Sequence, residues 1–302
     1  MLCKELKEAF VSEGKAANRD SLIVAASVSA EKATIDASYQ VPQIAMHLDF
    51  INVLTFDFHG PWESVTGHHS PLYKGSQDTG NKTYSNTDYA MRYWRDQGAP
   101  AQKLNLGLAA YGRAFDLSTA SSDTCLYLDG VTTQLIPDQR APYATTENQW
   151  VGFDNEDSLD IKMNNFGGAF LWSLDLDDMD GELCRMGSNP LISHLYNLLV
   201  PASSSRLVCY YNSEAADRED EGQFTVSDID PNKCTHLIYA FSDINTQNEL
   251  VPSSGTDIQR YQSFNGLKTR FTAMVATKQN RETFIQSAIK ILREKMGLMA
   301  KP

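Results

Sequence analysis

The chain has few basic residues, no cluster of them and no long hydrophobic run. Its 26 lysines and arginines stand against 38 aspartates and glutamates, which gives the 302 residues a formal net charge of −12. Nucleic acids and anionic membrane surfaces are therefore poor partners. No apolar window approaches the roughly 20 residues of a membrane span, and residues 1–15 have the pattern of an amphipathic helix rather than of a signal sequence. We expect no nucleic-acid partner and no membrane partner.

Cysteine is also sparse, and its spacing excludes common metal sites. None of the cysteines has the CxxC or Cys/His spacing that is typical of zinc sites, so we expect no metal and no cofactor. An odd number allows two disulfides and one free thiol. Asn81 begins an Asn-Lys-Thr sequon, which matters only in the secretory pathway. The five cysteines are Cys3, Cys125, Cys184, Cys209 and Cys234.

Residues 50–73 contain an apolar run that ends abruptly in an acid, a histidine and a glycine. A strand that is apolar throughout is usually buried on both faces, as in a parallel sheet covered by helices. Asp57 follows this run, flanked by Phe56, Phe58 and Trp62. A carboxylate among aromatic rings suits a sugar, whose C–H faces stack on rings while its hydroxyls need acceptors. On this segment alone, a buried aspartate that caps a turn explains the pattern equally well.

Short apolar runs alternate with helical or polar stretches along the chain. Helical spacing occurs at 85–98 and 280–297. Strands that alternate with helices predict a parallel sheet, open or closed into a barrel, whose active site lies at the carboxyl ends of the strands. Several runs end there in polar or aromatic residues, such as Tyr111, Arg113 and Trp172. The expected strands are 21–28, 50–56, 103–112, 167–175, 206–211 and 235–241.

Several long motifs are similar to one known family. LTFDFHGPWESVTGHHSPLY, KLNLGLAAYGRAFDL, QWVGFDN, FGGAFLWSLDLDDMDGELC and LVCYYNSEA with CTHLIYAF resemble the animal chitinases and chitinase-like lectins of glycoside hydrolase family 18. The order differs, because the segments at 206–211 and 235–241 resemble the first two strands of that family's eight-stranded barrel. In this chain both segments come after the segment that resembles the eighth strand.

The resemblance implies an α/β fold of the (β/α)8 TIM-barrel type, incomplete, with about six strands in permuted order. Residues 1–200 resemble the C-terminal half of a barrel, with a shortened α+β insertion at about 114–150. Residues 201–205 are then a linker, and 206–302 resemble the front of a second barrel. The late strands either fold back beside the early ones, or each half stays partial with unpaired edges that favour aggregation.

The resemblance also implies a catalytic mechanism and the loss of its acid residue. Family enzymes use a glutamate, at the end of a DxxDxDxE motif on strand four, to protonate the glycosidic oxygen while the substrate's N-acetyl group attacks. The chain lacks that strand. DLDDMDGE, which ends in Glu182, fits the motif in letters, but its acids continue past the strand into a glycine-containing turn. We therefore do not expect Glu182 to be the catalytic acid.

Individual positions carry implied roles. Asp57 resembles the carboxylate that holds the acetamide nitrogen, and Phe56 stands where catalytic relatives have a tyrosine. Tyr111 and Arg113 resemble residues that bond sugar hydroxyls. Trp172 and Trp62 resemble residues that stack on sugar rings. For Trp172, ordinary core packing is the alternative. The implied disulfides are Cys209 with Cys234 and Cys125 with Cys184, which leaves Cys3 free.

Three hypotheses about function follow. The leading one is an extracellular, monomeric protein that binds chitin or N-acetylglucosamine oligomers without efficient hydrolysis. The second is an active chitinase that uses Glu182 or an acid outside this chain. The third is a partial product without activity of its own.

Overall fold

The structure is a computed structural model, and it describes residues 2–117, 132–146, 148–163, 168–200, 205–219, 222–247, 249–267 and 272–277, the last as backbone only. The expected helix at 280–297 and Cys125 lie outside these residues.

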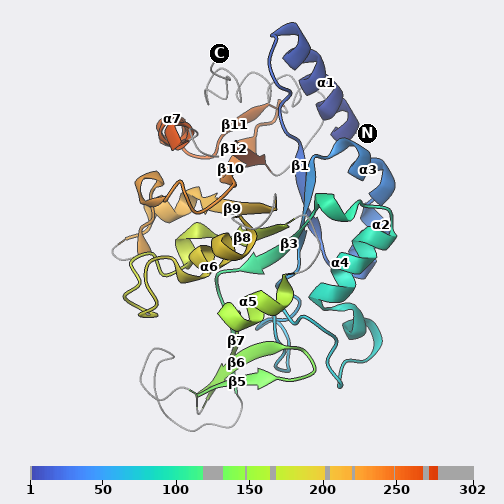
Figure 1. Ribbon diagram of the computed structural model, residues 1–302, viewed down its shortest axis with the longest axis vertical. Helices are drawn as coiled ribbons and strands as arrows, with labels where there is room; N and C mark the ends of the chain where they lie inside the picture. The colour runs from blue at the N-terminus through green and yellow to red at the C-terminus, as the bar shows by residue number, and fades with distance from the viewer. Residues whose placement is uncertain are drawn as a thin grey trace.

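A curled sheet of parallel strands forms the centre of the molecule (Figure 1). The strands follow the order β1, β2, β3, β8, β9 and β10. Strand β12 pairs in parallel with β10, and the short β11 pairs with β10 in antiparallel fashion. The strands are β1 (Ala25–Ser29), β2 (Phe50–Leu54), β3 (Leu104–Ala109), β8 (Gly168–Trp172), β9 (Arg206–Asn212), β10 (His236–Ile244), β11 (Leu250–Pro252) and β12 (Thr272–Thr277).

Helices follow most of the parallel strands, and Figure 1 shows α1 to α4 along one side of the sheet. Helix α4 begins at an asparagine cap, since the Asn86 side chain accepts a hydrogen bond from the Tyr89 amide. Its buried face includes Trp94, whose indole N–H donates to the carbonyl of Ser29 at 2.9 Å. The helices are α1 (Leu2–Ala16), α2 (Lys32–Ser38), α3 (Val41–His47), α4 (Thr87–Asp96), α5 (Glu156–Lys162), α6 (Pro190–Leu199) and α7 (Asp257–Gly266).

The expectation of an incomplete (β/α)8-type barrel is confirmed. The described residues supply seven parallel strands, and the one beyond the expected six is β12. Strand β8 pairs directly with β9, so segments on either side of 201–205 share one sheet. Gly168 makes this join possible, because a Cβ there would lie 2.0 Å from the carbonyl oxygen of Arg206 and its φ is +143°.

Successive side chains along each strand point to opposite faces of the sheet, and both faces are covered by apolar residues. On β9, the Leu207, Cys209 and Tyr211 side chains pack in the outer core beneath the helices. The intervening Val208 and Tyr210 belong to a second cluster inside the curl of the sheet. A strand buried on both sides has no polar face, which is why these segments are nearly continuous apolar runs in the sequence.

The described part of the insertion is a separate antiparallel sheet, at the bottom of Figure 1. Its strand order is β4, β7, β6 and β5. Strand β4 follows β3 closely, so the insertion grows out of the carboxyl edge of the main sheet. The bounds are β4 (Arg113–Asp116), β5 (Thr132–Ile136), β6 (Ala141–Thr145) and β7 (Gln149–Gly152).

One of the two implied disulfides lies wholly within the described residues, and it is formed. Cys209 and Cys234 are bonded across 25 residues of sequence. Among the described residues, Cys184 is exposed and has no disulfide partner; its implied partner Cys125 lies outside these residues, so that pairing stays a prediction. The Asp178 carboxylate accepts the Cys184 amide at 2.6 Å, and burial together with this carboxylate raises the pKa of the thiol. The Asp178 carboxylate thus helps to close the turn that carries Cys184. Within the described ranges, Cys3 has no disulfide partner either.

No helix in the described ranges is long and apolar enough to cross a membrane.

Candidate functional site

Asp57 lies just beyond β2, at the carboxyl edge of the main sheet. Its φ of 60° puts the backbone in the left-handed region, which costs a non-glycine residue on the order of 1 kcal/mol or more. The neighbouring Thr55 is buried, and its hydroxyl donates to the Gly107 carbonyl at 2.7 Å and accepts from the Gly107 amide at 2.9 Å. The end of β2 is thereby fixed against β3, and the strained turn places Asp57 outside the sheet.

Arg113, the first residue of β4, forms a bidentate ion pair with Asp57. Its Nε donates to Oδ1 and its terminal nitrogen to Oδ2, both at 2.8 Å. The guanidinium also lies over the rings of Tyr111 and Trp62, 5.0 and 5.5 Å from their centroids. The Asp57 carboxylate is therefore held by a side chain of another strand, and it does not serve as a local turn cap.

The electrostatics of this group keep Asp57 charged. Burial by itself raises the pKa of Asp57, but contacts with His69, Arg113 and Tyr111 outweigh it and hold the pKa below the ordinary value. Burial and the Asp57 anion raise the pKa of Tyr111, so the phenol keeps its proton and remains a donor. The group therefore offers an anionic acceptor with a phenol donor beside it across the neutral pH range.

Trp172 ends β8 on the same edge, because β2, β3 and β8 run parallel. Its ring stacks on Phe241 at a centroid distance of 5.6 Å and tilts against Tyr210 at 5.2 Å. The indole is half-buried, so part of it is open to a ligand. Packing and stacking, which the sequence posed as alternatives, are both compatible with this position.

A ladder of polar side chains supports the inside of the curl below these rings. The Tyr210 hydroxyl lies 2.5 Å from the Ser27 hydroxyl and accepts from the Asn52 amide at 3.1 Å. Asn52 in turn accepts from Asn105 at 2.8 Å. These residues come from β9, β1, β2 and β3, so the ladder ties the late strand to the early ones. Nothing in the local sequence of any one strand indicated this connection.

Phe56 and Trp62 occupy different surroundings. Phe56 is buried inside the curl, edge-on to Tyr111 at 6.2 Å and near Phe170 at 5.9 Å. Trp62 is 61% exposed and covers Gly60, where a Cβ would lie 2.2 Å from the indole. The exposed Trp62 ring beside Arg113 is free to contact a ligand, whereas the buried Phe56 can only shape the floor of the site.

The acids of the DLDDMDGE segment do not form a catalytic array. Asp175 is fully buried and paired with Arg218 at 2.6 Å. Asp178 accepts from the Gly181 and Cys184 amides. Glu182 is exposed in a turn. The segment passes through a 3-10 turn (Leu174–Leu176) and irregular backbone, so it lacks the strand that would align alternate carboxylates on one face.

His69 also belongs to this site. Its Nδ1 lies 3.7 Å from Asp57 Oδ1, and its ring is 5.4 Å from that of Tyr111. The adjacent His68 does have a turn role: its Nε2 contacts the carbonyls of Pro142 and Phe153, and its Nδ1 accepts from Ser70. A doubled histidine so soon after Asp57 was the only available signal.

A buried ion pair anchors the loop that carries these histidines. Lys162 Nζ donates to both oxygens of Asp154, at 2.6 and 2.7 Å, and to the carbonyl and hydroxyl oxygens of Ser70. Both charged side chains are fully buried. Because every donor of the ammonium is used, the pair fixes Ser70, and with it His68 and His69, relative to α5.

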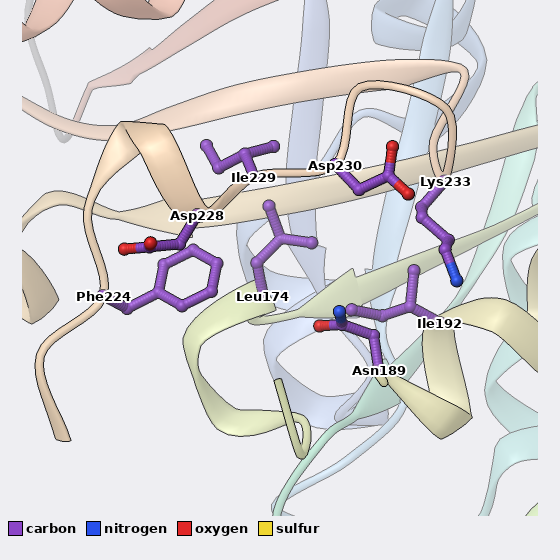
Figure 2. Close-up of a pocket in the computed structure, with 8 residues that line it drawn as sticks. All are labelled: Leu174, Asn189, Ile192, Phe224, Asp228, Ile229, Asp230 and Lys233. Atoms are coloured by element: carbon purple, nitrogen blue, oxygen red, sulfur yellow. The ribbon is translucent and has the colours of Figure 1, made fainter. Parts of the chain in front are cut away.

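A separate hollow lies beside β8 and the start of α6 (Figure 2). Its acids are already engaged: Asp228 accepts from the amide and hydroxyl of Thr225, and Asp230 accepts from Asn232. It encloses about 210 Å³ including open solvent. We assign it to the packing of residues 174–192 against residues 224–233. It is lined by Leu174, Asn189, Ile192, Phe224, Asp228, Ile229, Asp230 and Lys233.

The fold and the carboxyl-edge site define a barrel-type α/β protein with a polar and aromatic mouth. The family model of Glycosyl hydrolases family 18 matches residues 1–177 and 206–297. The chain therefore belongs to glycosyl hydrolase family 18.

Individual relatives agree with this assignment. Human Chitinase-3-like protein 2 is 39% identical over 64% of the chain and 57% of its own length. Mouse Chitotriosidase-1 is 36% identical over 68% of the chain and 50% of its own length. The chain thus spans about half the length of these curated relatives. A solved structure of human YKL-39, described as a pseudo-chitinase with retained chitooligosaccharide binding, matches with a TM-score of 0.61 at 38% identity, over 65% of this chain and 62% of that one.

Proposed function

We propose that the chain binds oligomers of N-acetylglucosamine at the carboxyl edge of its sheet without hydrolysing them efficiently. The observation that carries this proposal is the Asp57–Arg113 pair beside Tyr111 and the exposed Trp62, with the half-buried Trp172 at the end of β8 on the same edge of the sheet. Sugars need this combination of charged acceptors and aromatic surfaces.

Asp57 has the role of an acceptor for the acetamide N–H in this proposal. A carboxylate offers about four lone-pair positions, and the bidentate Arg113 contact leaves some of them unused. Tyr111 and Arg113 would bond hydroxyl or carbonyl oxygens, while Trp172 and Trp62 would stack on sugar faces. The human relative described as retaining chitooligosaccharide binding supports the same ligand class.

Catalysis would require a proton donor, and the acids described above are not suited to this role. General acid catalysis contributes about two to four orders of magnitude in rate. Asp57 is held anionic, so it is not suited to donate a proton near neutral pH. Glu182 lies in an exposed turn, and the buried Asp175 is neutralised by Arg218. Binding without efficient turnover is the function that these residues support best.

The active-chitinase alternative requires a donor that none of these residues provides. Chitotriosidase-1 of mouse, by its name an enzyme, is among the relatives, so the family resemblance alone does not decide between the two. The third hypothesis, a partial product without activity, requires that the chain fail to fold cooperatively.

An extracellular location, a monomeric state and the division at 201–205 belong to the same proposal. The Cys209–Cys234 disulfide is consistent with an oxidising compartment. Asn81 is exposed in a short 3-10 turn (Gly80–Tyr84), as an N-glycosylation site must be. Peptide mapping of protein from a secreting host tests the glycan on Asn81, and light scattering tests the monomer.

One experiment separates the three hypotheses. Purified protein is titrated with tri-N-acetylchitotriose while tryptophan fluorescence is recorded, and release of a chromogenic leaving group is assayed in parallel. Saturable binding without turnover supports the proposal. Turnover that is abolished by Glu182→Gln supports the enzyme, and turnover that survives this change points to another acid. Neither signal, with no cooperative melting transition, supports the partial product.

A further inference from the structure

His69 is a buried histidine that faces the Asp57 carboxylate and makes no side-chain hydrogen bond within the described part of the chain. Its side chain is 0% exposed, and neither ring nitrogen has a partner among the described residues. A buried polar group without a partner is uncommon and destabilising, so such a residue in a site calls for an explanation. Its Nδ1 lies 3.7 Å from Oδ1 of Asp57, beyond hydrogen-bond length yet close enough for a charge on the ring to matter.

We propose that His69 is a positioning residue that makes ligand binding at Asp57 depend on pH. A protonated His69 holds Oδ1 of Asp57 and withdraws that oxygen from the acetamide N–H of the ligand. This inference rests on the proposed function, since it concerns the same carboxylate. It goes further by giving the site a proton-controlled state.

Among the described residues that face His69, Asp57 is the one anion that can pair with a charged ring. The groups that face it are Asp57, the His68 ring at 5.5 Å and the Tyr111 ring at 5.4 Å. Tyr111 keeps its proton, and burial lowers the pKa of His68 to about 4, so that ring stays neutral. A protonated His69 therefore pairs with Asp57 and is the second cation at this carboxylate, after Arg113.

The same oxygen, Oδ1, already accepts from Arg113 Nε. With His69 neutral, this oxygen makes one charged hydrogen bond and keeps room for a neutral amide donor. With His69 charged, two cations compete for it, and a neutral amide is the weaker competitor because charged hydrogen bonds are about twice as strong. Beyond His68 lie Asp154 and Lys162, whose opposite charges offset each other.

The sign of the effect follows from linkage. If the ligand favours the state with neutral His69, binding releases a proton wherever the free protein carries it, and affinity falls as the pH falls. Histidine is the side-chain type that changes charge between about pH 5 and 8. Asp57 stays ionised over that range, so its own protonation does not produce the same trend.

The test measures binding of tri-N-acetylchitotriose by isothermal titration calorimetry between about pH 5.5 and 7.5, in buffers of different ionisation enthalpy. For the wild type we expect a Kd that rises about three- to tenfold toward the acid end, with proton release on binding. In His69→Asn, which keeps a small polar side chain without a charge, Kd should vary by less than about twofold and proton release should vanish. His69→Gln serves if the asparagine variant melts early.

Two other histidines provide controls. His194 is partly exposed and pairs with Asp160 at 2.7 Å, so His194→Asn should keep the wild-type pH response. His59, in the same loop as His69, contacts Glu63 at 2.7 Å, and His59→Asn should keep it as well.

The outcomes separate this inference from the proposed function. A pH response that persists in His69→Asn, that disappears in His59→Asn instead, or that runs toward tighter binding in acid overturns the role of His69. A wild-type affinity that does not change with pH overturns it too, while leaving the proposed function standing. If the folded wild type binds no trisaccharide at any pH, the proposed function itself has failed.

Discussion

Arg113 and Asp57 form a bidentate ion pair between β4 and the end of β2, with two N–O distances of 2.8 Å. Each partner is about one-third exposed, so the pair lies at the surface of the site rather than in the core. It orients the carboxylate before a ligand arrives, which lowers the ordering cost of binding.

Replacing Arg113 with lysine should weaken oligosaccharide binding by about tenfold, because lysine keeps the charge but loses the planar fork that matches a carboxylate. Calorimetry with tri-N-acetylchitotriose at neutral pH measures the change. Arg95→Lys is the matched control, since Arg95 pairs with Asp96 on the exposed face of α4. An unchanged Kd in Arg113→Lys contradicts the orienting role.

Changing Phe56 to tyrosine should strengthen binding. Phe56 stands where the family resemblance places a tyrosine, and its ring is edge-on to Tyr111 inside the curl. A new hydrogen bond to the ligand is worth about 1 kcal/mol, or roughly fivefold in Kd. The same titration gives the answer. Weaker binding would mean that the hydroxyl is buried without a partner at this position.

Breaking the Asp154–Lys162 pair should be strongly destabilising. Asp154→Asn leaves a buried ammonium without its counter-ion, and we expect a loss of about 3–5 kcal/mol in the free energy of unfolding. Urea denaturation monitored by circular dichroism provides the measurement. The double variant Asp154→Leu/Lys162→Met should recover much of the loss, because it leaves no charge buried; a double variant as unstable as the single one argues against this reason.

The same pair predicts an acid limit of stability. Burial raises the pKa of Asp154, but attraction to the Lys162 ammonium outweighs it and lowers the pKa below the ordinary value. Its contribution is therefore complete above the unfolded-state pKa of about 4 and is lost as the pH falls through the folded value. Melting temperatures of the wild type should drop below about pH 4, and Asp154→Asn should lack this part of the drop.

Gly168→Ala should destabilise the join between β8 and β9. A Cβ there meets the Arg206 backbone at 2.0 Å in a positive-φ conformation, and we expect about 2 kcal/mol or more of lost stability. Gly266→Ala is the control, since a Cβ at Gly266 meets nothing within 4 Å. Equal stability of the two variants in urea denaturation would show that the late strand does not pair with β8 in solution.

The cysteine assignment is tested by alkylation and mass spectrometry. Without reduction, the exposed Cys184 should be modified, while Cys209 and Cys234 should be recovered as a linked pair of peptides. Replacing both linked cysteines with serine should lower stability by about 3 kcal/mol, as expected for a closed loop of this size. Recovery of Cys184 in a disulfide with Cys125 would instead confirm the second implied bond.

Much of the sheet could be predicted from the sequence, because strands buried on both faces leave continuous apolar runs. The expected strands at 50–56 and 103–112 correspond to β2 and β3, and Asp57 does lie where the first of them ends. The sequence did not predict β12, because its segment resembles no strand at that place in the family order.

Cross-strand partners could not be predicted in the same way. Tyr210 meets Ser27 although 183 residues separate them, and His69 lies beside Asp57 in a loop that Lys162 anchors through Ser70. Such contacts depend on how strands and loops lie in space, and a local pattern carries no record of it.

By itself, the sequence determined the α/β class, the family resemblance and the position of Asp57 at a strand end, since apolar periodicity and motif letters encode these directly. Only the tertiary structure decided that late and early strands share one sheet and that Asp57 is held by Arg113 and faced by His69. Each of these depends on the distance between residues far apart in the chain, which folding alone sets.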